Sequence, residues 1–241
     1  MLRLALFDID GTLISGRDAL NAAAWGVGIA DGLGLPGAGP EEVPHVGFTD
    51  RATAIAIALA YRLPSGEIAA RVDRALALKD AYLVSLVGGE PARHPLSACP
   101  GAHDFIEALR IAGIKLGIVT GNTAAAASLM LLRAGFRPSD FAVASHGERI
   151  TDRADLVGAA IAAARPFLPG LLAREVLVIG DTLADVASGR AWHTRTLAVA
   201  SGRMRAAELA VGAPDLLVDS LCPTPNLWTA LFGSAQRAPA A

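Results

Sequence analysis

Two aspartates follow the first apolar segment of the chain, in the stretch MLRLALFDIDGTL. Residues 2–7 are short and almost continuously apolar, which is typical of a parallel strand covered on both faces. Asp8 and Asp10 are two positions apart, so in an extended chain both face the same side. They should converge just past the carboxyl end of the strand, where open α/β sheets bind ligands. Because like charges this close repel, one carboxyl must hold a proton or a cation must lie between them.

Two more apolar runs end in polar residues of a similar kind. The run at residues 114–120 ends in the stretch VTGN, which contains Thr120. The run at residues 175–181 ends in the stretch GDTLAD, which contains Asp181 and Asp185. Parallel strands bring their carboxyl ends to one edge of a sheet, so four carboxylates and one hydroxyl should gather there. Oxygen ligands of this kind indicate a hard divalent cation, and Mg2+ fits best. A magnesium ion with open positions is suited to holding a phosphate.

The order of apolar and periodic segments predicts the fold class. Weaker apolar runs at 141–145 and 195–201 add two expected strands, and apolar spacings of three and four residues predict helices between the strands. Strands that alternate with helices favour an α/β fold, here a Rossmann-like, doubly wound parallel sheet. The helices are expected at residues 102–113, 124–136 and 154–167.

A long segment near the N-terminus interrupts this alternation. It contains no convincing strand, and its alanine-rich stretches predict helices that Gly- and Pro-rich loops separate. These helices are expected at about residues 18–33, 50–62 and 65–87. We therefore expect an α/β core of residues 1–14 and 99–232, an inserted helical cap of 15–98, and a small, polar, disordered tail of 233–241.

The stretches FDIDGTL, VTGN and GDTLAD, in this order and spacing, resemble three signatures of the haloacid dehalogenase superfamily of phosphohydrolases. The resemblance covers residues 1–14 and 99–225, and the layout is most similar to the phosphoglycolate phosphatase branch. It implies that the insertion is the helical cap of that family and that the protein is an Mg2+-dependent phosphatase. The implied substrate is a small phosphorylated metabolite, phosphoglycolate-like or a sugar phosphate. Asp10 favours a phosphate substrate, because the dehalogenases of the family lack an acid at this position.

The resemblance also implies roles for the matching residues. Asp8 would attack phosphorus and form an aspartyl-phosphate, while Asp10 would protonate the leaving oxygen and then activate the hydrolytic water. The Thr120 hydroxyl and the backbone around Gly121 and Asn122 would hold the phosphoryl oxygens, because a helix begins there.

The same resemblance implies a ligand set for Mg2+. The Asp8 side chain, the Asp10 carbonyl and Asp181 would hold the ion, and Asp185 would ligate directly or through water. These residues come from two separate segments of the chain, so the ligand set depends on the predicted sheet bringing the segments together.

One expected group departs from the family pattern. The family usually supplies a lysine ahead of the last signature, whereas Lys79 lies in the insertion and Lys115 on the second strand. The segment GERITDRADLV offers Arg149 and Arg153 instead. We prefer Arg153, because it lies at the start of the following helix, where the family lysine usually falls. Arginine can hold phosphate oxygens through two parallel hydrogen bonds.

The insertion offers candidates for substrate contacts, each with a structural alternative. Thr49, Asp50 and Arg51 could read the substrate from the cap, but Thr49 or Asp50 could equally serve as the N-cap of the next helix. His45 and His94 are weaker candidates of the same kind. The stretch GLGLPG at 32–37 matches a dinucleotide fingerprint only in its letters, since no strand precedes it.

Three other functions stay open. A phosphoglucomutase-like enzyme would return the phosphoryl group to a sugar and would need a bisphosphate activator. A phosphonate hydrolase would need a cap lysine for a Schiff base, and Lys79 is the only lysine in the insertion. A catalytically silent binding protein would not need both Asp8 and Asp10.

Composition limits the remaining possibilities. The formal net charge of −2 gives no broad basic surface for nucleic acid. The two cysteines have no metal or disulfide spacing, so a reducing cytoplasm is the expected location. Every long apolar window contains a charge or a proline, so we expect no membrane span. We expect a monomer or a homodimer.

Overall fold

The computed structural model of the chain describes residues 1–233. Apart from Gly233, the predicted disordered tail lies outside the described residues. Within the described part, no helix is both long enough and apolar enough to cross a lipid bilayer.

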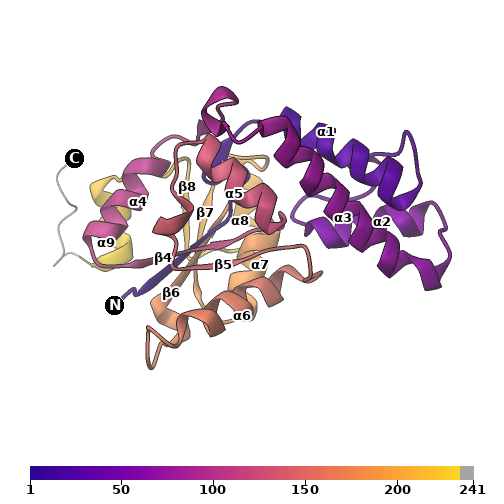
Figure 1. The fold of residues 1–241 in the computed structure, drawn as a ribbon. Coiled ribbons are helices and arrows are strands. Elements are labelled where there is room, and N and C mark those ends of the chain that lie inside the picture. Colours follow the sequence, from indigo (N-terminus) through magenta and orange to yellow (C-terminus); the bar gives the residue numbers. More distant parts are fainter. Residues whose placement is uncertain (234–241) are drawn as a thin grey trace.

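The centre of the molecule is a six-stranded parallel sheet in the order β5-β4-β1-β6-β7-β8 (Figure 1). This arrangement confirms the predicted doubly wound α/β fold. The strands are β1 (Leu4–Phe7), β4 (Lys115–Val119), β5 (Val143–Ser145), β6 (Val176–Gly180), β7 (Arg195–Val199) and β8 (Leu216–Val218). The sequence did not predict β8, a three-residue edge strand in which no residue is fully buried.

Strand β1 lies at the point where the strand order reverses. Residues Leu4–Phe7 pair with β4 on one side and with β6 on the other. The chain fills the β4 side first and then crosses to the β6 side, which leaves a crevice at the carboxyl ends of β1 and β6. Asp8 and Asp181 follow these two strands directly.

Helices cover both faces of the sheet. This cover is needed because the side chains of β1 point alternately to the two faces and are apolar on both. Ala5 and Phe7 face a cluster built with α4, α5 and α9, whereas Leu4 and Leu6 face α6. Helix α7 packs beside α6 and over β6 and β7. The helices of the core are α4 (Ala102–Ile111), α5 (Ala124–Arg133), α6 (Arg153–Ala164), α7 (Leu183–Ala191), α8 (Ala206–Ala210) and α9 (Pro225–Phe232).

The inserted segment forms a separate group of helices next to the carboxyl ends of the strands, drawn in indigo and purple in Figure 1. It has its own apolar cluster, which includes Ile29, Ile57 and Leu76. A two-stranded ribbon of β2 (Ile14–Ser15) and β3 (Ser97–Ala98) joins its two ends. The helices are α1 (Ala19–Val27), α2 (Asp50–Ala60) and α3 (Ser65–Val87). The division into core and cap at these residues remains our proposal, and the separate cluster supports it.

The predicted helix at 18–33 differs from the structure in its second half. Residues Gly28–Leu33 form a wider π-helical segment after α1. Gly28 and Gly32 lie directly against α3, where a Cβ atom on Gly32 would overlap Ala75. Apolar periodicity alone does not distinguish such a segment from a regular α-helix. Short 3-10 turns occur at Pro40–Glu42, Pro91–Arg93, Pro138–Asp140 and Ala173–Glu175.

Candidate active site

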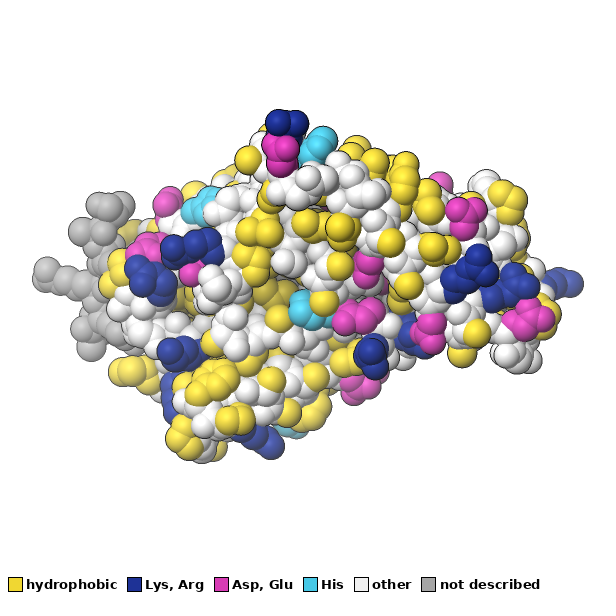
Figure 2. Space-filling view, in the orientation of Figure 1, with side chains coloured by type: hydrophobic (Ala, Val, Ile, Leu, Met, Phe, Trp, Pro, Cys, Tyr) yellow, Lys and Arg dark blue, Asp and Glu magenta, His cyan; other side chains and the backbone are white. Residues whose placement is uncertain are grey.

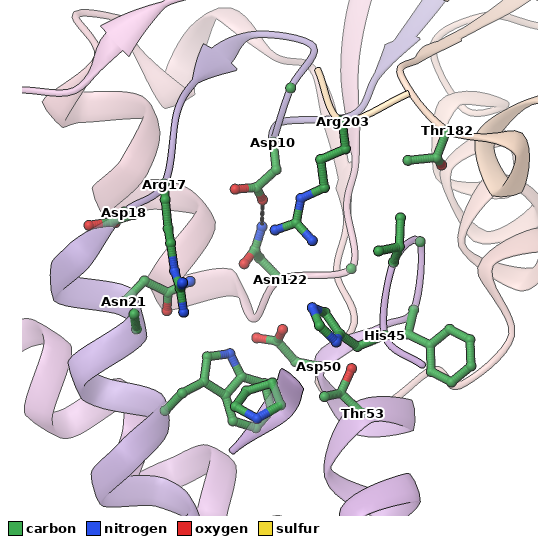
Figure 3. A pocket seen from close by; sticks show the side chains of 18 of the residues that line it. Asp10, Arg17, Asp18, Asn21, His45, Asp50, Thr53, Asn122, Thr182 and Arg203 are labelled. Atoms are coloured by element: carbon green, nitrogen blue, oxygen red, sulfur yellow. Dashed lines mark hydrogen bonds between the residues drawn. The ribbon is translucent and has the colours of Figure 1, made fainter. Parts of the chain in front are cut away.

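The carboxyl edge of the sheet and the inserted helices enclose a cavity of about 700 Å3. Six predicted site side chains line it from the core: Asp8, Asp10, Thr120, Asn122, Arg153 and Asp181. Trp25 and Asp50 line it from the insertion. Figure 3 shows Asp50 across the cavity from Asp10, with Asn122 between them. Residues far apart in the sequence therefore line one cavity.

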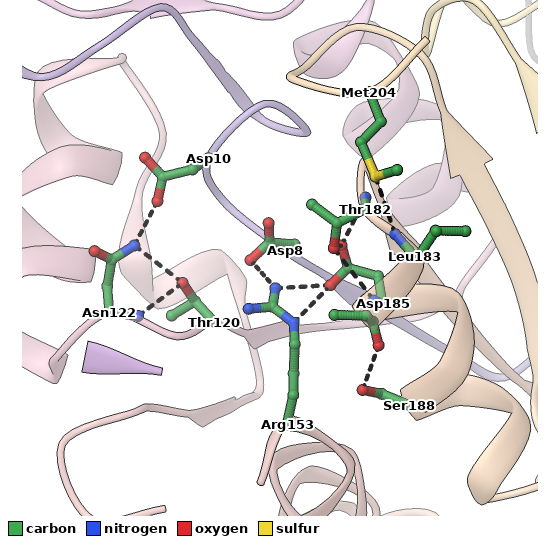
Figure 4. Close-up of polar contacts among 11 residues, drawn as sticks. Asp8, Asp10, Thr120, Asn122, Arg153, Thr182, Leu183, Asp185, Ser188 and Met204 are labelled. Atoms are coloured by element: carbon green, nitrogen blue, oxygen red, sulfur yellow. Dashed lines mark hydrogen bonds and ion pairs between the residues drawn. The ribbon is translucent and has the colours of Figure 1, made fainter. Parts of the chain in front are cut away.

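Arg153 lies between two buried carboxylates (Figure 4). Its Nη2 is 2.6 Å from Asp8 Oδ1 and 2.7 Å from Asp185 Oδ1, and its Nε donates to Asp185 Oδ1 at 2.8 Å. Asp152 caps the N-terminus of α6, which fixes Arg153 as the first residue of that helix. Burial raises the pKa of Asp8 well above its usual value, and the adjacent guanidinium of Arg153 opposes this rise.

Asp10 is held from the end of the neighbouring strand β4. Asn122 Nδ2 donates to Asp10 Oδ2 at 2.6 Å and to Thr120 Oγ1 at 3.1 Å. Burial raises the pKa of Asp10, while the hydrogen bond from Asn122 lowers it. The two aspartates thus have different partners, a guanidinium for Asp8 and an amide for Asp10. Neighbouring carboxyls in unlike surroundings can divide base and acid roles.

Asp181 completes a group of three buried carboxyls. Oxygen atoms of Asp8, Asp181 and Asp185 lie within 4.8 Å of one another. Asp181 Oδ2 accepts from the Arg203 backbone N–H at 2.9 Å, but Oδ1 is buried and has no hydrogen-bond partner among the described residues. Burial, with the charge of Asp185, raises the pKa of Asp181 to about 7. A buried carboxylate oxygen without a partner fits the donor set of a divalent cation.

Asp185 is engaged on both of its oxygens. Oδ1 accepts from Arg153, and Oδ2 accepts from the Thr182 backbone N–H at 3.0 Å and from the Thr182 hydroxyl at 2.6 Å. Thr182 is the N-cap of α7, so this capping box orients the carboxylate. Direct ligation of a metal by Asp185 would require it to give up one of these partners, whereas contact through water would not.

Glycines let the chain approach Asp181 closely. A Cβ atom on Gly11 or on Gly202 would overlap the Asp181 carboxyl group. Gly11 also has a φ of 78°, which only glycine adopts without strain. The turn after Asp10 and the loop after β7 are therefore both packed against the carboxylate from opposite ends of the sequence.

Three predicted residues, Arg149, Thr49 and Arg51, do not line the cavity. Arg149 is exposed and borders a different groove, whereas Arg153 contacts Asp8. Thr49 does not line the cavity and caps α2 by accepting from the Ala52 N–H at 3.1 Å. Arg51 points out of the cavity, to Asp73 at 2.7 Å. Neither residue lines the cavity, so the cavity does not support their prediction as substrate contacts.

Lys79 is fully buried but does not line the cavity. Its Nζ lies 2.8 Å from Asp50 Oδ2 and 5.4 Å from the centre of the Trp25 ring. Asp50 Oδ2 also accepts from the Thr123 N–H at 3.2 Å, at the start of α5. The lysine therefore balances a buried carboxylate at the boundary between the inserted helices and the core.

The sequence patterns did not identify three residues that line the cavity, Arg17, Asn21 and Arg203. Arg203 follows the predicted strand at 195–201, so its place at a strand end was a usable signal. Arg17 and Asn21 lie in the first part of the insertion, where no pattern distinguishes them from surface residues.

Comparison with known proteins shows the family of the chain. A family model described as haloacid dehalogenase-like hydrolase matches residues 2–193. A phosphoglycolate phosphatase of Pseudomonas putida (strain KT2440) is 26% identical over 224 residues, 91% of this chain and 77% of that protein. The chain therefore belongs to the haloacid dehalogenase-like hydrolase family. It is an enzyme of the phosphatase type.

Solved structures of the family share the fold. CbbY from Rhodobacter sphaeroides in complex with phosphate has a TM-score of 0.64 at 20% identity, over 92% of this chain and 96% of that chain. A β-phosphoglucomutase from Clostridium difficile has a TM-score of 0.68 at 14% identity, over 96% and 97%. At these identities the likeness supports the architecture and leaves the substrate open.

Proposed function

We propose that the protein hydrolyses a small phosphorylated metabolite, with Mg2+ as cofactor and an aspartyl-phosphate on Asp8 as intermediate. One observation carries the proposal: Asp8 and Asp10 lie at the same cavity, one held by a cation and the other by an amide. That arrangement supplies a nucleophile beside a cation and a separate acid at one cavity.

The residues present account for both half-reactions. An Asp8 oxygen forms a bond to phosphorus while the ester P–O bond breaks, and Asp10 donates its proton to the leaving alcohol oxygen. Asp10 then removes a proton from water, which attacks the aspartyl-phosphate, releases inorganic phosphate and restores the Asp8 carboxylate. The Thr120 hydroxyl and the N–H of Gly121 hold the phosphoryl oxygens, and Arg153 balances their charge.

The acidic group at the crevice suits the expected ion. Asp8, Asp181 and the carbonyl of Asp10 would hold Mg2+, and Asp185 would reach it through water while keeping Arg153 in place. The ion would supply positive charge next to the phosphoryl group. The partnerless Asp181 oxygen is the feature of this chain that supports the assignment.

The alternatives differ in what supports them. A phosphonate hydrolase is disfavoured, because the Lys79 ammonium is buried against Asp50 and lies outside the cavity wall. A mutase on the same fold would show a lag that a sugar bisphosphate abolishes. A silent binding protein would show no turnover of any phosphate ester.

Two free cysteines, one exposed, fit a reducing compartment such as the cytoplasm.

Turnover of a panel of phosphorylated metabolites tests the proposal. We expect release of phosphate with Mg2+, its loss in EDTA, and a fall of more than about 10³-fold in Asp8→Asn, because the amide cannot act as the nucleophile. Asp104→Asn makes the same change at an exposed position of α4 and should keep full activity. Circular dichroism establishes that both variants are folded. Undiminished turnover in Asp8→Asn would remove Asp8 from the mechanism.

A further inference from the structure

The first turn of α2 is joined to the core by main-chain hydrogen bonds. The Asp50 N–H donates to the Gly121 carbonyl at 2.7 Å, and the Arg51 N–H donates to the Gly147 carbonyl at 3.1 Å. A Cβ atom on Gly121 would overlap the Phe48 carbonyl, so the close approach of the two segments depends on a glycine. The first N–H groups of a helix have no acceptor within the helix itself. Carbonyl groups of the core accept from two of them here, which fixes the start of α2 against the turn that follows β4.

The Asp50 side chain holds the other end of the same turn. Its Oδ2 accepts from the Thr123 N–H at 3.2 Å, whereas its main-chain N–H donates to Gly121, two residues earlier in the turn. Asn122 is the residue between these two contacts. One residue of the inserted segment therefore holds residues 121–123 at both ends, and we refer to these residues as the bracketed turn.

A buried lysine keeps the Asp50 carboxylate in this position. Lys79 is fully buried, and its Nζ lies 2.8 Å from Asp50 Oδ2 and 3.7 Å from Asp80 Oδ1. The Thr123 hydroxyl donates to the same Asp80 oxygen at 2.6 Å. If the Asp50 carboxylate turned away, the buried ammonium group would lose its nearest partner, which is costly. Helix α3 therefore stabilises the bracketed turn through Lys79 and Asp80.

The bracketed turn carries the residue that holds the acid of the proposed reaction. Asn122 Nδ2 donates to Asp10 Oδ2 at 2.6 Å, and the Asn122 N–H donates to Thr120 Oγ1 at 3.2 Å. Figure 3 shows Asn122 between Asp10 and Asp50. The rotamers open to a side chain depend on its backbone, and Asp50 holds the backbone on both sides of Asn122. Contacts therefore lead without a break from the start of α2 to Asp10.

We propose that Asp50 is a positioning residue for Asp10. It holds the bracketed turn so that Asn122 keeps the Asp10 carboxyl in place for proton transfer to the leaving oxygen. The proposal rests on the phosphatase function above, in which the ester P–O bond breaks while the Asp10 proton moves to that oxygen. Such a step depends steeply on geometry, because a misplacement of about 1 Å can cost about 10²-fold in rate.

Direct contact with the substrate is the alternative role for Asp50, because this residue also lines the cavity. The two roles differ in how they depend on the leaving group. A 4-nitrophenolate ion leaves with little help from an acid, whereas the alkoxide of benzyl alcohol needs a proton in order to leave. A positioning role therefore affects benzyl phosphate much more than 4-nitrophenyl phosphate. Loss of a contact with the substrate affects these two esters of similar size alike.

Variants that lack the buried charge test the proposal. Lys79→Met is the reference, because a change of Asp50 alone would leave the lysine unpaired, whereas apolar replacement of a whole buried pair is often tolerated. Asp50→Asn/Lys79→Met keeps an oxygen for the Thr123 N–H, and Asp50→Leu/Lys79→Met, of similar size, removes it. We expect the ratio of kcat/KM for benzyl phosphate to that for 4-nitrophenyl phosphate to fall by about tenfold in the leucine variant and by less than about twofold in the asparagine variant. An unchanged ratio in the leucine variant would overturn the proposal.

The outer side of the same junction offers a control. Charged side chains of both signs lie where the inserted helices meet the core on the face drawn in Figure 2. Arg51 of α2 lies 2.7 Å from Asp73 of α3, whose side chain is 64% exposed. Asp73→Asn removes this charge without touching the bracketed turn, and it should leave the ratio unchanged because exposed ion pairs contribute little. A fall as large as that of the leucine variant would overturn the proposal, because any disturbance of the junction would then have the same effect.

A double-mutant cycle tests the path through Asn122. Asn122→Ala should lower the same ratio, because it removes the hydrogen bond to Asp10. Adding Asn122→Ala to Asp50→Leu/Lys79→Met should lower the ratio by less than about twofold further, because the two changes act on one path. Losses that multiply would overturn the proposal, since Asp50 would then act independently of Asn122.

Nuclear magnetic resonance separates this inference from the phosphatase function. The side-chain amide signals of Asn122, assigned by their loss in Asn122→Ala, report its hydrogen bond to Asp10 without turnover. Relative to Lys79→Met, they should shift in Asp50→Leu/Lys79→Met, and Asp73→Asn should leave them in place. Unshifted signals in the leucine variant contradict the inference, whatever the activity of the enzyme. Absence of turnover for every ester, with these signals shifted, contradicts the phosphatase function alone.

Discussion

Arg153 holds together a group of charges that would otherwise repel one another. It is buried, and it contacts Asp8 and Asp185 within 2.8 Å. Loss of one partner from a buried pair leaves an uncompensated charge, which costs about 3 to 5 kcal/mol. At this position two carboxylates would lose their partner at once.

The first prediction concerns this charge. Arg153→Met should lower the free energy of unfolding by about 3 kcal/mol or more, whereas Arg153→Lys should lose less because the positive charge remains. Urea denaturation at pH 7.5 measures both losses. Equal losses in the two variants would mean that packing, not charge, is what Arg153 contributes.

A second prediction concerns the pH dependence of stability. Burial lowers the pKa of His146 below its usual value, and the charge of Glu148 opposes this. Below about pH 6.5 the unfolded chain therefore binds more protons at this residue than the folded chain does. Burial raises the pKa values of Asp8, Asp10 and Asp181, which favours the folded chain over the same pH range, so the contribution of His146 is measured as a difference between two proteins. Relative to His146→Gln, the unsubstituted protein should lose free energy of unfolding between pH 7.5 and pH 5.5. Urea denaturation of both proteins at pH 7.5 and at pH 5.5 measures this difference. The same change in the free energy of unfolding in both proteins would contradict the prediction.

Single residues were predictable from the sequence where a strand fixed their position. Asp8 and Asp181 follow strands directly and Asp10 comes two residues after Asp8, so the parallel sheet brings them to one edge. Arg17 and Arg51 were not predictable in this way. Which side of a loop or helix faces the cavity depends on the packing of the inserted helices on the core, and local periodicity does not contain that information.

At the scale of elements, α6 and α7 pack through a glycine and a tryptophan. The Trp192 indole N–H, just after α7, donates to the Ala154 carbonyl of α6 at 2.7 Å. A Cβ atom on Gly158 of α6 would overlap the Trp192 ring. The close contact between the two helices therefore depends on the absence of a side chain at residue 158.

This contact yields a third prediction. Gly158→Ala should destabilise the protein by about 1 to 3 kcal/mol through overpacking, although alanine favours a helix by up to about 1 kcal/mol relative to glycine. Gly66→Ala in α3, where a Cβ atom meets nothing within 4 Å, should be neutral or stabilising. Thermal unfolding of both variants tests this, and equal shifts would show that the Trp192 contact yields without cost.

Elements were predicted best where an apolar pattern was long and uninterrupted. The expected helix at 65–87 matches α3 to the residue, and the strong strands agree within one or two residues. The edge strand β8 and the π-helical segment were missed. Neighbouring elements determine both, through pairing with β7 and through close packing of Gly32 on α3.

On the scale of the whole molecule, a buried ion pair joins the inserted segment to the core. Arg133 at the end of α5 donates to both carboxylate oxygens of Asp18, at 2.6 Å and 3.0 Å, and to the His94 carbonyl at 2.7 Å. Asp18 is the N-cap of α1, and His94 lies in the segment that returns to the core. One guanidinium therefore contacts both connections between the inserted helices and the core.

The fourth prediction is that Arg133→Met loosens this junction. The free energy of unfolding should fall by about 3 kcal/mol, and amides at the start of α1 should exchange with solvent faster. Arg137→Met removes an exposed partner of Asp140 and should change stability by less than about 1 kcal/mol. Urea denaturation and hydrogen exchange compare the two variants. Unchanged exchange in α1 would show that the junction does not depend on Arg133.

The place of β1 in the sheet has a consequence for synthesis on the ribosome. Its two neighbours begin at Lys115 and Val176, and the loop that packs on Asp181 extends to Arg203. The first strand to be translated can therefore pair with β4 only after about half of the chain is made, and with β6 only once Ile179 has been added. Such distant pairing slows folding. A partly synthesised chain that stops short of Asp181 therefore has Asp8 and Asp10 but cannot assemble the active site around them.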